Sequence, residues 1–188
     1  MEKIPTIFER NWEGNRKVKN IFIQNLSSEK LKTMTATEKL DGTNVRVTVR
    51  NHTCVRLEKR KNPTKEQKVE GIKNPWYVDA IESDQQDKHI FSALKNTDLS
   101  SVPDGEWSGE ALGENIQGNP LNLTGNTIVF FSLGHTPVLD APTTFEELKE
   151  WLPQQESVYS KNGCKIEGIV WHGENGEMFK IKARDFDK

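Results

Sequence analysis

The sequence predicts an α+β fold built from antiparallel sheets and a few short helices. Three observations predict this class: short β-branched runs that alternate in polarity, Asn- and Gly-containing turns between such runs, and helical patterns that are few and short. The length of 188 residues suits one domain, and we expect a single domain over residues 1–188 with neither linker nor repeat.

Composition and charge argue against several classes of protein. The formal net charge of −2 excludes a uniformly basic nucleic-acid-binding protein but leaves room for a local basic face. No apolar run approaches the ~18 residues of a membrane span, and the charged N-terminus is unlike a signal peptide. Two distant cysteines and four scattered histidines argue against a disulfide framework and a zinc hydrolase, so we expect a cytoplasmic protein.

The first hairpin is predicted from two alternating runs. Residues 45–50 (VRVTVR) and 53–57 (TCVRL) are β-branched, and Asn51-His52 between them indicates a tight turn. Residues 58–75 are predicted to form a charged loop. Within residues 56–73, seven basic side chains outnumber three acidic ones, which suits a clamp on a nucleic-acid backbone or an ordinary solvated face.

The middle of the chain is predicted to contain one helix and one buried strand. Residues 88–96 suit a short helix, and residues 128–133 (IVFFSL) form an apolar run of the length of a buried strand. Residues 101–126 are rich in Gly, Pro, Asn and Ser, which indicates a loop around one strand.

A second helix is predicted where FEELKEWL follows two threonines. Thr143 or Thr144, with Glu146 or Glu147 three residues later, forms the pattern of a capping box. Pro153 is expected to end this helix, because proline removes a backbone donor and clashes with the preceding turn.

The last hairpin is predicted from residues 166–171 and 177–182, which flank a Gly-Glu-Asn-Gly turn. If residues 173–176 make up the whole loop, the register places Glu167 opposite Lys182. This pairing would join a carboxylate and an ammonium group across the two strands.

The face of the last strand adds a second cation to this pair. Lys180 and Lys182 share one strand face, whereas Phe179 and Ile181 share the other. The predicted patch therefore holds one carboxylate and two ammonium groups. An exposed surface ion pair worth ~0–1 kcal/mol would explain the same pattern without any function.

A candidate nucleophile lies before the first hairpin, where residues 38–44 read Glu-Lys-Leu-Asp-Gly-Thr-Asn. A nucleophilic lysine must be neutral, and the ordinary lysine pKa of ~10.4 leaves about one in a thousand neutral near pH 7.4. Burial or neighbouring cations must therefore favour the neutral amine. The Asp41-Gly42 turn would present Lys39 for such chemistry, although a solvated lysine at a turn gives the same pattern.

Taken together and in order, the motifs of the chain resemble those of the covalent nucleotidyltransferases, which comprise ATP-dependent DNA and RNA ligases and mRNA capping enzymes. Five matches carry the resemblance: Lys39-Leu40-Asp41-Gly42, Gly105-Glu106-Trp107-Ser108-Gly109, Phe131, Glu167-Gly168-Ile169-Val170 and Lys180-Ile181-Lys182. They span nearly the whole chain, and the resemblance implies a nucleotidyltransferase, or ATP-grasp-like ligase adenylation, domain.

The resemblance also implies a role for each motif. Lys39 would accept the nucleotide, Glu106 would read the ribose and Phe131 would stack on the adenine. Glu167 would serve the metal, whereas the lysines of the last motif would hold the phosphate and favour the neutral amine of Lys39. The implied catalytic residues are Lys39, Lys180 and Lys182, and the nucleotide-binding set is Glu38, Lys39, Asn44, Arg60, Glu106, Phe131, Glu167, Lys180 and Lys182.

Within this superfamily the chain resembles the nick-sealing RNA ligases of bacteria and phages. Thr43-Asn44 follows the motif glycine as in RNA ligases, and Asn44 fits a role in orienting phosphate or nicked-strand groups. That class has an arginine that contacts the phosphates at the end of the next strand. Arg60 matches this position best, and Arg56 is the alternative.

The implied cofactors are ATP and Mg²⁺, or Mn²⁺ in its place. Mg²⁺ keeps several waters and binds through phosphates and one or two carboxylates, so Glu167 is the first candidate ligand, through water, with Glu106 close by. The chain ends six residues after Lys182, so we expect neither an OB-fold nor another C-terminal module. An accessory protein would then supply grip on the RNA or nicked duplex.

The sequence therefore predicts an ATP-dependent RNA ligase that acts in RNA repair. It would join 3′-OH and 5′-phosphate ends through a lysyl-AMP intermediate and an adenylated polynucleotide. Two alternatives stay open. One is a ligase of DNA nicks or DNA/RNA hybrids from the same superfamily. The other is a paralogue that binds nucleotide or RNA without catalysis.

Overall fold

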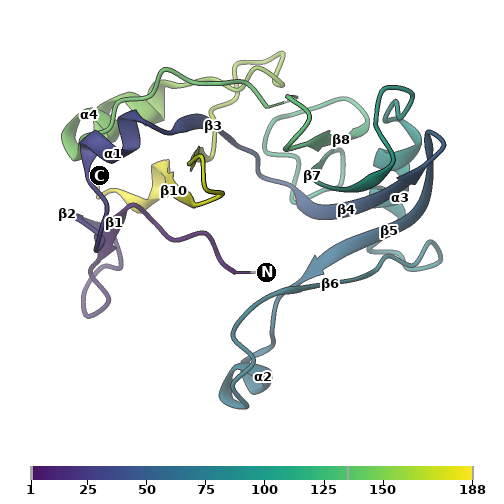
Figure 1. Ribbon diagram of the computed structural model, residues 1–188, viewed down its shortest axis with the longest axis horizontal. Coiled ribbons are helices and arrows are strands. Elements are labelled where there is room, and N and C mark those ends of the chain that lie inside the picture. The colour runs from purple at the N-terminus through teal and green to yellow at the C-terminus, as the bar shows by residue number, and fades with distance from the viewer. Residues whose placement is uncertain (1, 135, 188) are drawn as a thin grey trace. The chain divides into compact units, whose positions relative to one another are not determined.

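The computed structural model describes residues 2–134 and 136–187, which fold into two compact units. Unit 1 comprises Met1–Lys3 and Asp41–Thr136, and unit 2 comprises Ile4–Leu40 and Pro137–Lys188. Each unit contains antiparallel strands, short helices and a hydrophobic core of its own, which confirms the predicted α+β class (Figure 1). None of the helices in the described ranges has the length and apolar character required to cross a membrane.

Unit 1 is built on one five-stranded antiparallel sheet with the strand order β6-β5-β4-β7-β8. Its strands are β4 (Thr43–Arg50), β5 (Thr53–Lys61), β6 (Trp76–Asp79), β7 (Gly105–Gly113) and β8 (Asn126–Phe130), and its helices are α2 (Lys65–Val69) and α3 (Lys88–Lys95). Alternation along β4 buries Val45, Val47 and Val49 on one face, where Ile90 of α3 packs. The opposite face of the sheet carries polar side chains.

The predicted hairpin at residues 45–57 is confirmed as β4 and β5. Asn51 and His52 both have positive φ, 49° and 57°, as the mirror-image turn between two right-twisted strands requires. A β-bulge beyond this turn shifts the register by one residue, so that Arg46 lies opposite Glu58. The predicted helix at residues 88–96 is also confirmed, as α3, and the strand expected within residues 101–126 is β7.

The charged loop predicted for residues 58–75 is wrong. Strand β5 continues to Lys61 because it pairs with both β4 and β6. Helix α2 then begins at a capping box, in which the Thr64 hydroxyl accepts the Gln67 N–H and the Gln67 side chain accepts the Thr64 N–H. This helix buries no side chain and lies on an arm that extends beyond β5 and β6 (Figure 1).

Unit 2 contains a three-stranded sheet with the order β10-β9-β3 and a separate hairpin of β1 and β2. The elements are β1 (Phe8–Arg10), β2 (Val18–Phe22), α1 (Ser28–Lys32), β3 (Thr35–Lys39), α4 (Phe145–Trp151), β9 (Gly168–His172) and β10 (Met178–Lys182), with 3₁₀ turns η1 (Leu152–Gln154) and η2 (Ala183–Asp185). Phe8, Leu148, Trp171 and Ile181 form the centre of its core.

The capping box predicted for the second helix is wrong, although the helix itself is confirmed as α4. Thr144 is the N-cap residue, but its hydroxyl donates to the Glu147 carboxylate at 2.6 Å and accepts no backbone N–H. The α-helix ends at Trp151, and Pro153 lies in the 3₁₀ turn η1, as expected of a residue that stops a helix.

The last hairpin forms as predicted, but its predicted register is wrong by one residue. Lys182 pairs with Gly168 and not with Glu167. The loop takes one more residue than expected, because the Gly173 N–H donates to the Glu177 carbonyl and Gly176 adopts a positive φ of 79°. The predicted faces of β10 are confirmed, since Phe179 and Ile181 both pack on the core.

Candidate active site

Gly168 is the centre of the basic part of the site, in unit 2. It lies on the middle strand β9 and is paired with Lys39 of β3 on one side and Lys182 of β10 on the other. The strands approach so closely that a Cβ on Gly168 would lie 2.1 Å from the Ile181 carbonyl oxygen. Because glycine has no side chain, Lys39, Gly168 and Lys182 can lie directly opposite one another across the three strands.

The carboxylate of Glu167, one residue before Gly168, bridges the two lysines. Its Oε2 accepts a hydrogen bond from Lys39 Nζ and its Oε1 accepts one from Lys182 Nζ. The Arg184 guanidinium lies 3.6 Å from the same Oε1. The structure thus brings together the carboxylate and the lysines that the sequence singled out, although Glu167 reaches them from the end of the strand.

Burial and charge change the pKa of two groups in this cluster. Burial raises the pKa of Glu167, but the ammonium groups of Lys39 and Lys182 outweigh it and hold that pKa below its ordinary value. Burial, followed by the positive charges of Lys182 and Lys39, lowers the pKa of Lys180 to about 8. The cluster therefore contains an ionised carboxylate and an amine that loses its proton near pH 8.

The lowered pKa of Lys180 predicts a rise of stability with pH. Above a folded-state pKa of about 8, folded Lys180 is neutral while the unfolded side chain, with its ordinary pKa of 10.5, still binds a proton. The free energy of unfolding should therefore increase from about pH 8 to pH 10.5, and this gain in stability should be absent below pH 8. Denaturant titrations across this range should show the rise for the natural protein and not for Lys180→Met.

A matched control for this prediction is Lys161→Met, which removes an exposed lysine of the same unit and should leave the rise unchanged. At pH 7 the Lys180→Met variant should be more stable than the natural protein, because it no longer buries an ammonium group. Parallel pH profiles for Lys180→Met and the natural protein would contradict the assignment.

Two residues that the sequence reasoning missed hold Lys182 in place. The Asp185 carboxylate accepts the Lys182 backbone N–H at 3.0 Å and a hydrogen bond from Arg10 at 2.8 Å. Asp185 is buried, so the ion pair with Arg10 is protected from water. The only sequence signal was the position of Asp185 three residues after the motif lysine, which is typical of a short turn.

Glu38 also lies in unit 2, next to the candidate nucleophile. It is 3% exposed, and its Oε1 has no hydrogen-bond partner within the described ranges. Burial raises the pKa of Glu38, against opposing hydrogen bonds from Ser157 and Val158. Since a buried carboxyl oxygen without a partner destabilises a fold, this group is a candidate for contact with a ligand.

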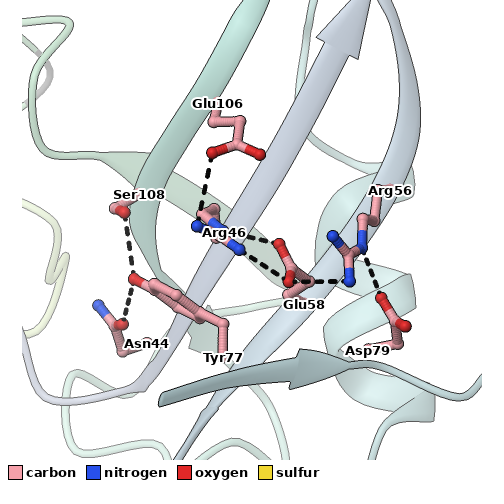
Figure 2. A network of polar contacts seen from close by, with 8 residues as sticks. All are labelled: Asn44, Arg46, Arg56, Glu58, Tyr77, Asp79, Glu106 and Ser108. Carbon is pink, nitrogen blue, oxygen red and sulfur yellow. Dashed lines mark hydrogen bonds and ion pairs between the residues drawn. The ribbon is translucent and has the colours of Figure 1, made fainter. Parts of the chain in front are cut away.

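The remaining candidate residues lie in unit 1, on the polar face of its sheet. Asn44 and Glu106 come from β4 and β7, where they alternate with residues that face the core, and Arg60 is an exposed residue near the end of β5. Figure 2 shows Asn44 and Glu106 joined to a network of polar contacts on this face. The Tyr77 hydroxyl donates to Asn44 Oδ1 at 2.8 Å and lies 3.1 Å from Ser108 Oγ, which fixes the Asn44 amide.

The network also contains residues to which the sequence analysis gave no role, namely Arg46, Glu58, Tyr77 and Ser108 (Figure 2). The signal that would have found Arg46 and Ser108 is strand parity, since each lies two residues from a residue that the sequence singled out. Glu58 and Tyr77 lay in or next to the region that was predicted to be a loop, so no strand parity could be assigned to them.

The structure separates the two arginine candidates. Arg56 is engaged by Glu58 at 3.3 Å and by Asp79 at 2.7 Å. Arg60 is exposed, and no ion pair to it is found in the part of the chain that the structure describes. Arg60 is therefore the better placed of the two for an anionic ligand, in keeping with the order of preference from the sequence.

Phe131 lies one residue beyond the end of β8, because that strand begins at Asn126 and ends three residues earlier than the predicted 128–133. Its N–H donates to the Ser108 carbonyl at 3.1 Å, and the residue is 38% exposed. The preceding Phe130 is fully buried in the core of unit 1. The buried Phe130 thus fixes the end of the strand, whereas the partly exposed Phe131 ring can contact a ligand.

The motif glycine Gly42 has a packing reason of its own in unit 1. A Cβ at this position would lie 2.1 Å from the Ala111 carbonyl oxygen. The Gly42 N–H donates to the Glu110 carboxylate at 3.1 Å.

The two predicted metal ligands belong to separate units, Glu106 to unit 1 and Glu167 to unit 2. The described residues contain no group of three or more His, Cys, Asp or Glu placed to hold a metal.

Comparison with solved structures places this fold. The chain superposes on Naegleria gruberi RNA ligase with PPi with a TM-score of 0.53 at 19% identity, covering 98% of this chain and 59% of that one. A lysine-to-alanine mutant of the same ligase with ATP and Mn gives a TM-score of 0.53 at 18% identity, covering 97% and 60%. The chain therefore shares the fold of these RNA ligase structures over the part that it covers.

The likeness extends over part of those ligases. The chain spans about three fifths of their length. A glutamate-to-alanine mutant of the same ligase with AMP and Mn gives a TM-score of 0.52 at 17% identity, covering 97% of this chain and 60% of that one. No protein-family model and no curated protein matches the sequence.

Proposed function

We propose that this chain is an ATP-dependent RNA ligase of the nick-sealing class, which acts in RNA repair in the cytoplasm. One observation carries the proposal. Lys39 and Lys182 flank Gly168 in adjacent strands, and the Glu167 carboxylate lies between their ammonium groups. A nucleophilic lysine, a phosphate-binding lysine and a carboxylate that orients both are the parts that a lysyl-AMP reaction needs. The ligase fold supports the same proposal.

In the first step, neutral Lys39 Nζ attacks the α-phosphorus of ATP. An N–P bond forms, the P–O bond to the leaving group breaks, pyrophosphate departs, and the nitrogen releases one N–H proton to solvent. Lys39 must first leave its ion pair with Glu167 and release a proton to solvent, because the lowered pKa of Glu167 makes that carboxylate a poor base. Lys180 and Lys182 stabilise the negative charge that develops on the phosphate.

The next two steps transfer the nucleotide and seal the strand. A 5′-phosphate oxygen attacks the phosphorus of lysyl-AMP, so that the N–P bond breaks and Lys39 is restored. A 3′-OH then attacks the 5′-phosphate, which forms the phosphodiester and expels AMP. Asn44, which is held by Tyr77, and the exposed Arg60 are proposed to orient phosphate groups during these steps.

The proposed cofactors are ATP and Mg²⁺ or Mn²⁺. Glu167 fits the metal by its chemistry, because an ionised carboxylate beside phosphate-binding lysines suits a hard cation that keeps several waters. When bound, the metal would neutralise triphosphate charge. Glu106 is the second proposed metal ligand, and Glu38 is proposed to contact the nucleotide through its unpartnered oxygen.

Phe131 is proposed to stack on the adenine, and Phe131→Ala is expected to weaken ATP binding by roughly 1–3 kcal/mol, the free energy of one lost base stack. A titration of ATP against the protein measures this change directly. Phe131→Tyr is the matched control, since it keeps an aromatic face and should retain affinity. Equal affinity of the alanine variant and the natural protein would exclude Phe131 as the stacking residue.

The arm beyond β5 is proposed to contact the backbone of the RNA substrate. The cations of this arm and of the adjoining end of β5, for which no ion pair is found within the described ranges, are Arg60, Lys61, Lys65, Lys68 and Lys73. Only Glu66 and Glu70 oppose them between residues 60 and 73, and Val69 is 89% exposed on α2. So small a set of phosphate contacts predicts weak grip on the substrate, so we propose that an accessory protein assists.

The function is tested by following label from the protein onto nucleic acid. The chain is first adenylated with α-labelled ATP, freed of nucleotide, and mixed in excess with nicked RNA duplex, nicked DNA duplex or a nicked hybrid. We expect rapid self-adenylation, then slower transfer to the 5′-phosphate of nicked RNA that requires high substrate concentration. Transfer to DNA alone would favour the DNA-ligase alternative, and transfer to none would favour a paralogue that has lost catalysis.

A further inference from the structure

Arg46 occupies the middle of the polar network in unit 1 and contacts three different groups (Figure 2). Its Nε and Nη2 donate to the two carboxylate oxygens of Glu58 at 2.7 and 2.9 Å. Its Nη1 donates to Glu106 Oε2 at 3.4 Å. The guanidinium carbon lies 4.6 Å from the centre of the Tyr77 ring, which covers one face of the group.

Glu58 anchors this arginine. Its side chain is only 2% exposed, and a buried carboxylate is stable only when it is paired and hydrogen-bonded. The two parallel hydrogen bonds to Arg46 fix both the position and the plane of the guanidinium. A lysine could not reproduce this geometry, because its single ammonium group has no rigid fork.

The anchored guanidinium leaves one N–H group directed at Glu106. The Glu106 side chain is 53% exposed, so the ion pair adds little to stability. Its effect is on orientation: Arg46 engages Oε2 of Glu106, and Oε1, which has no hydrogen-bond partner among the described residues, is left to accept a hydrogen bond from a ligand. An exposed carboxylate without such a partner would sample several rotamers and would lose entropy on binding.

We propose that Arg46, anchored by Glu58, is a positioning residue that presents the Glu106 carboxylate to the ribose hydroxyls of ATP. The inference rests on the proposed function, in which Glu106 reads the ribose. Arg46 itself contacts no substrate in this scheme and acts only through Glu106.

The test compares adenylation with ATP, 2′-deoxy-ATP and 3′-deoxy-ATP, each scored as kcat/KM. The natural protein should prefer ATP over at least one deoxy analogue by ten-fold or more, and Glu106→Ala should abolish the preference. Arg46→Met/Glu58→Leu, which replaces the ion pair with apolar groups of similar size, should reduce the preference to less than three-fold. Adding Glu106→Ala to this double variant should change nothing further.

Arg56→Ala is the matched control, because Arg56 also contacts Glu58 but not Glu106. It should keep the full preference for ATP, whereas Arg46→Lys should lose most of it. Thermal unfolding checks each variant, and Glu58→Gln, which keeps the size of the side chain, takes the place of the double variant if that protein is unfolded.

The outcomes separate this inference from the proposed function. If Glu106→Ala abolishes the preference and the Arg46 variants retain it, the inference is overturned and the role of Glu106 stands. If the natural protein adenylates but shows no preference, both the ribose role and the inference fail. If the natural protein does not adenylate with any of the nucleotides, the proposed function fails and takes the inference with it.

Discussion

Lys39→Ala is expected to abolish covalent labelling of the protein by α-labelled ATP. The Lys39 ammonium group forms an ion pair with the Glu167 carboxylate, and Lys39 is paired with Gly168 of the neighbouring strand β9. Removing it leaves the site without its nucleophile, and no other side chain of the protein is proposed to form a bond to phosphorus. The measurement is incubation with label, followed by denaturing electrophoresis, which a phosphoramidate survives.

Lys39→Arg gives this prediction a sharper control. Arginine keeps a positive charge beside Glu167 but offers no neutral amine, so labelling should be lost while the fold and ATP binding remain. Labelling with GTP and NAD in place of ATP tests the choice of nucleotide in the same gel. Labelling of the alanine variant at the level of the natural protein would show that another residue carries the nucleotide.

Lys182→Met is expected to reduce the rate of adenylation by about 10²–10³-fold, the usual effect of removing one group that stabilises charge in a transition state. Lys182 pairs with Glu167 from the strand opposite Lys39, and its backbone is held by Asp185. Because the charge on the phosphate develops during the reaction, kcat should fall much more than KM rises. Single-turnover adenylation over a range of ATP concentrations separates the two effects.

Lys182→Arg is the conservative variant for this experiment and should recover part of the rate, since it restores the positive charge. A Lys182→Met protein with unchanged kcat and a raised KM would contradict the assignment. In that case the lysine would bind the ground state of ATP and the transition state equally.

Local patterns predicted the hairpins β4–β5 and β9–β10 and the helices α3 and α4 because their signals lie within a few residues, but they did not predict β1, β2, α1, β3, α2 or β6. The Asn51-His52 turn predicted the first hairpin, and the alternation of Lys180 and Lys182 with Phe179 and Ile181 predicted the faces of β10. The same approach failed at residues 58–75. There, charged residues such as Glu58 are buried in a strand by partners that are distant in sequence.

The register of the last hairpin shows how one residue can change a prediction. A loop of four residues would have placed Glu167 opposite Lys182, but the observed loop places Gly168 there. Glu167 still reaches both lysines because it lies at the end of the strand and its side chain extends between them. Loop geometry of this kind depends on backbone hydrogen bonds that the residue types alone do not specify.

By itself, the sequence determined the α+β class, the hairpins at residues 45–57 and 166–182, and, through the family resemblance, the identity of Lys39, Glu106, Glu167, Lys180 and Lys182 as candidate site residues. Only the tertiary structure decided that Gly168 separates two lysines, that Glu38 keeps an unpartnered oxygen in a buried position, and that Arg46 is anchored by Glu58. The physical reason is the range of the interactions. Periodicity and turn preferences act over a few neighbouring residues, whereas strand register, burial and the pairing of charges are set by segments far apart in the chain.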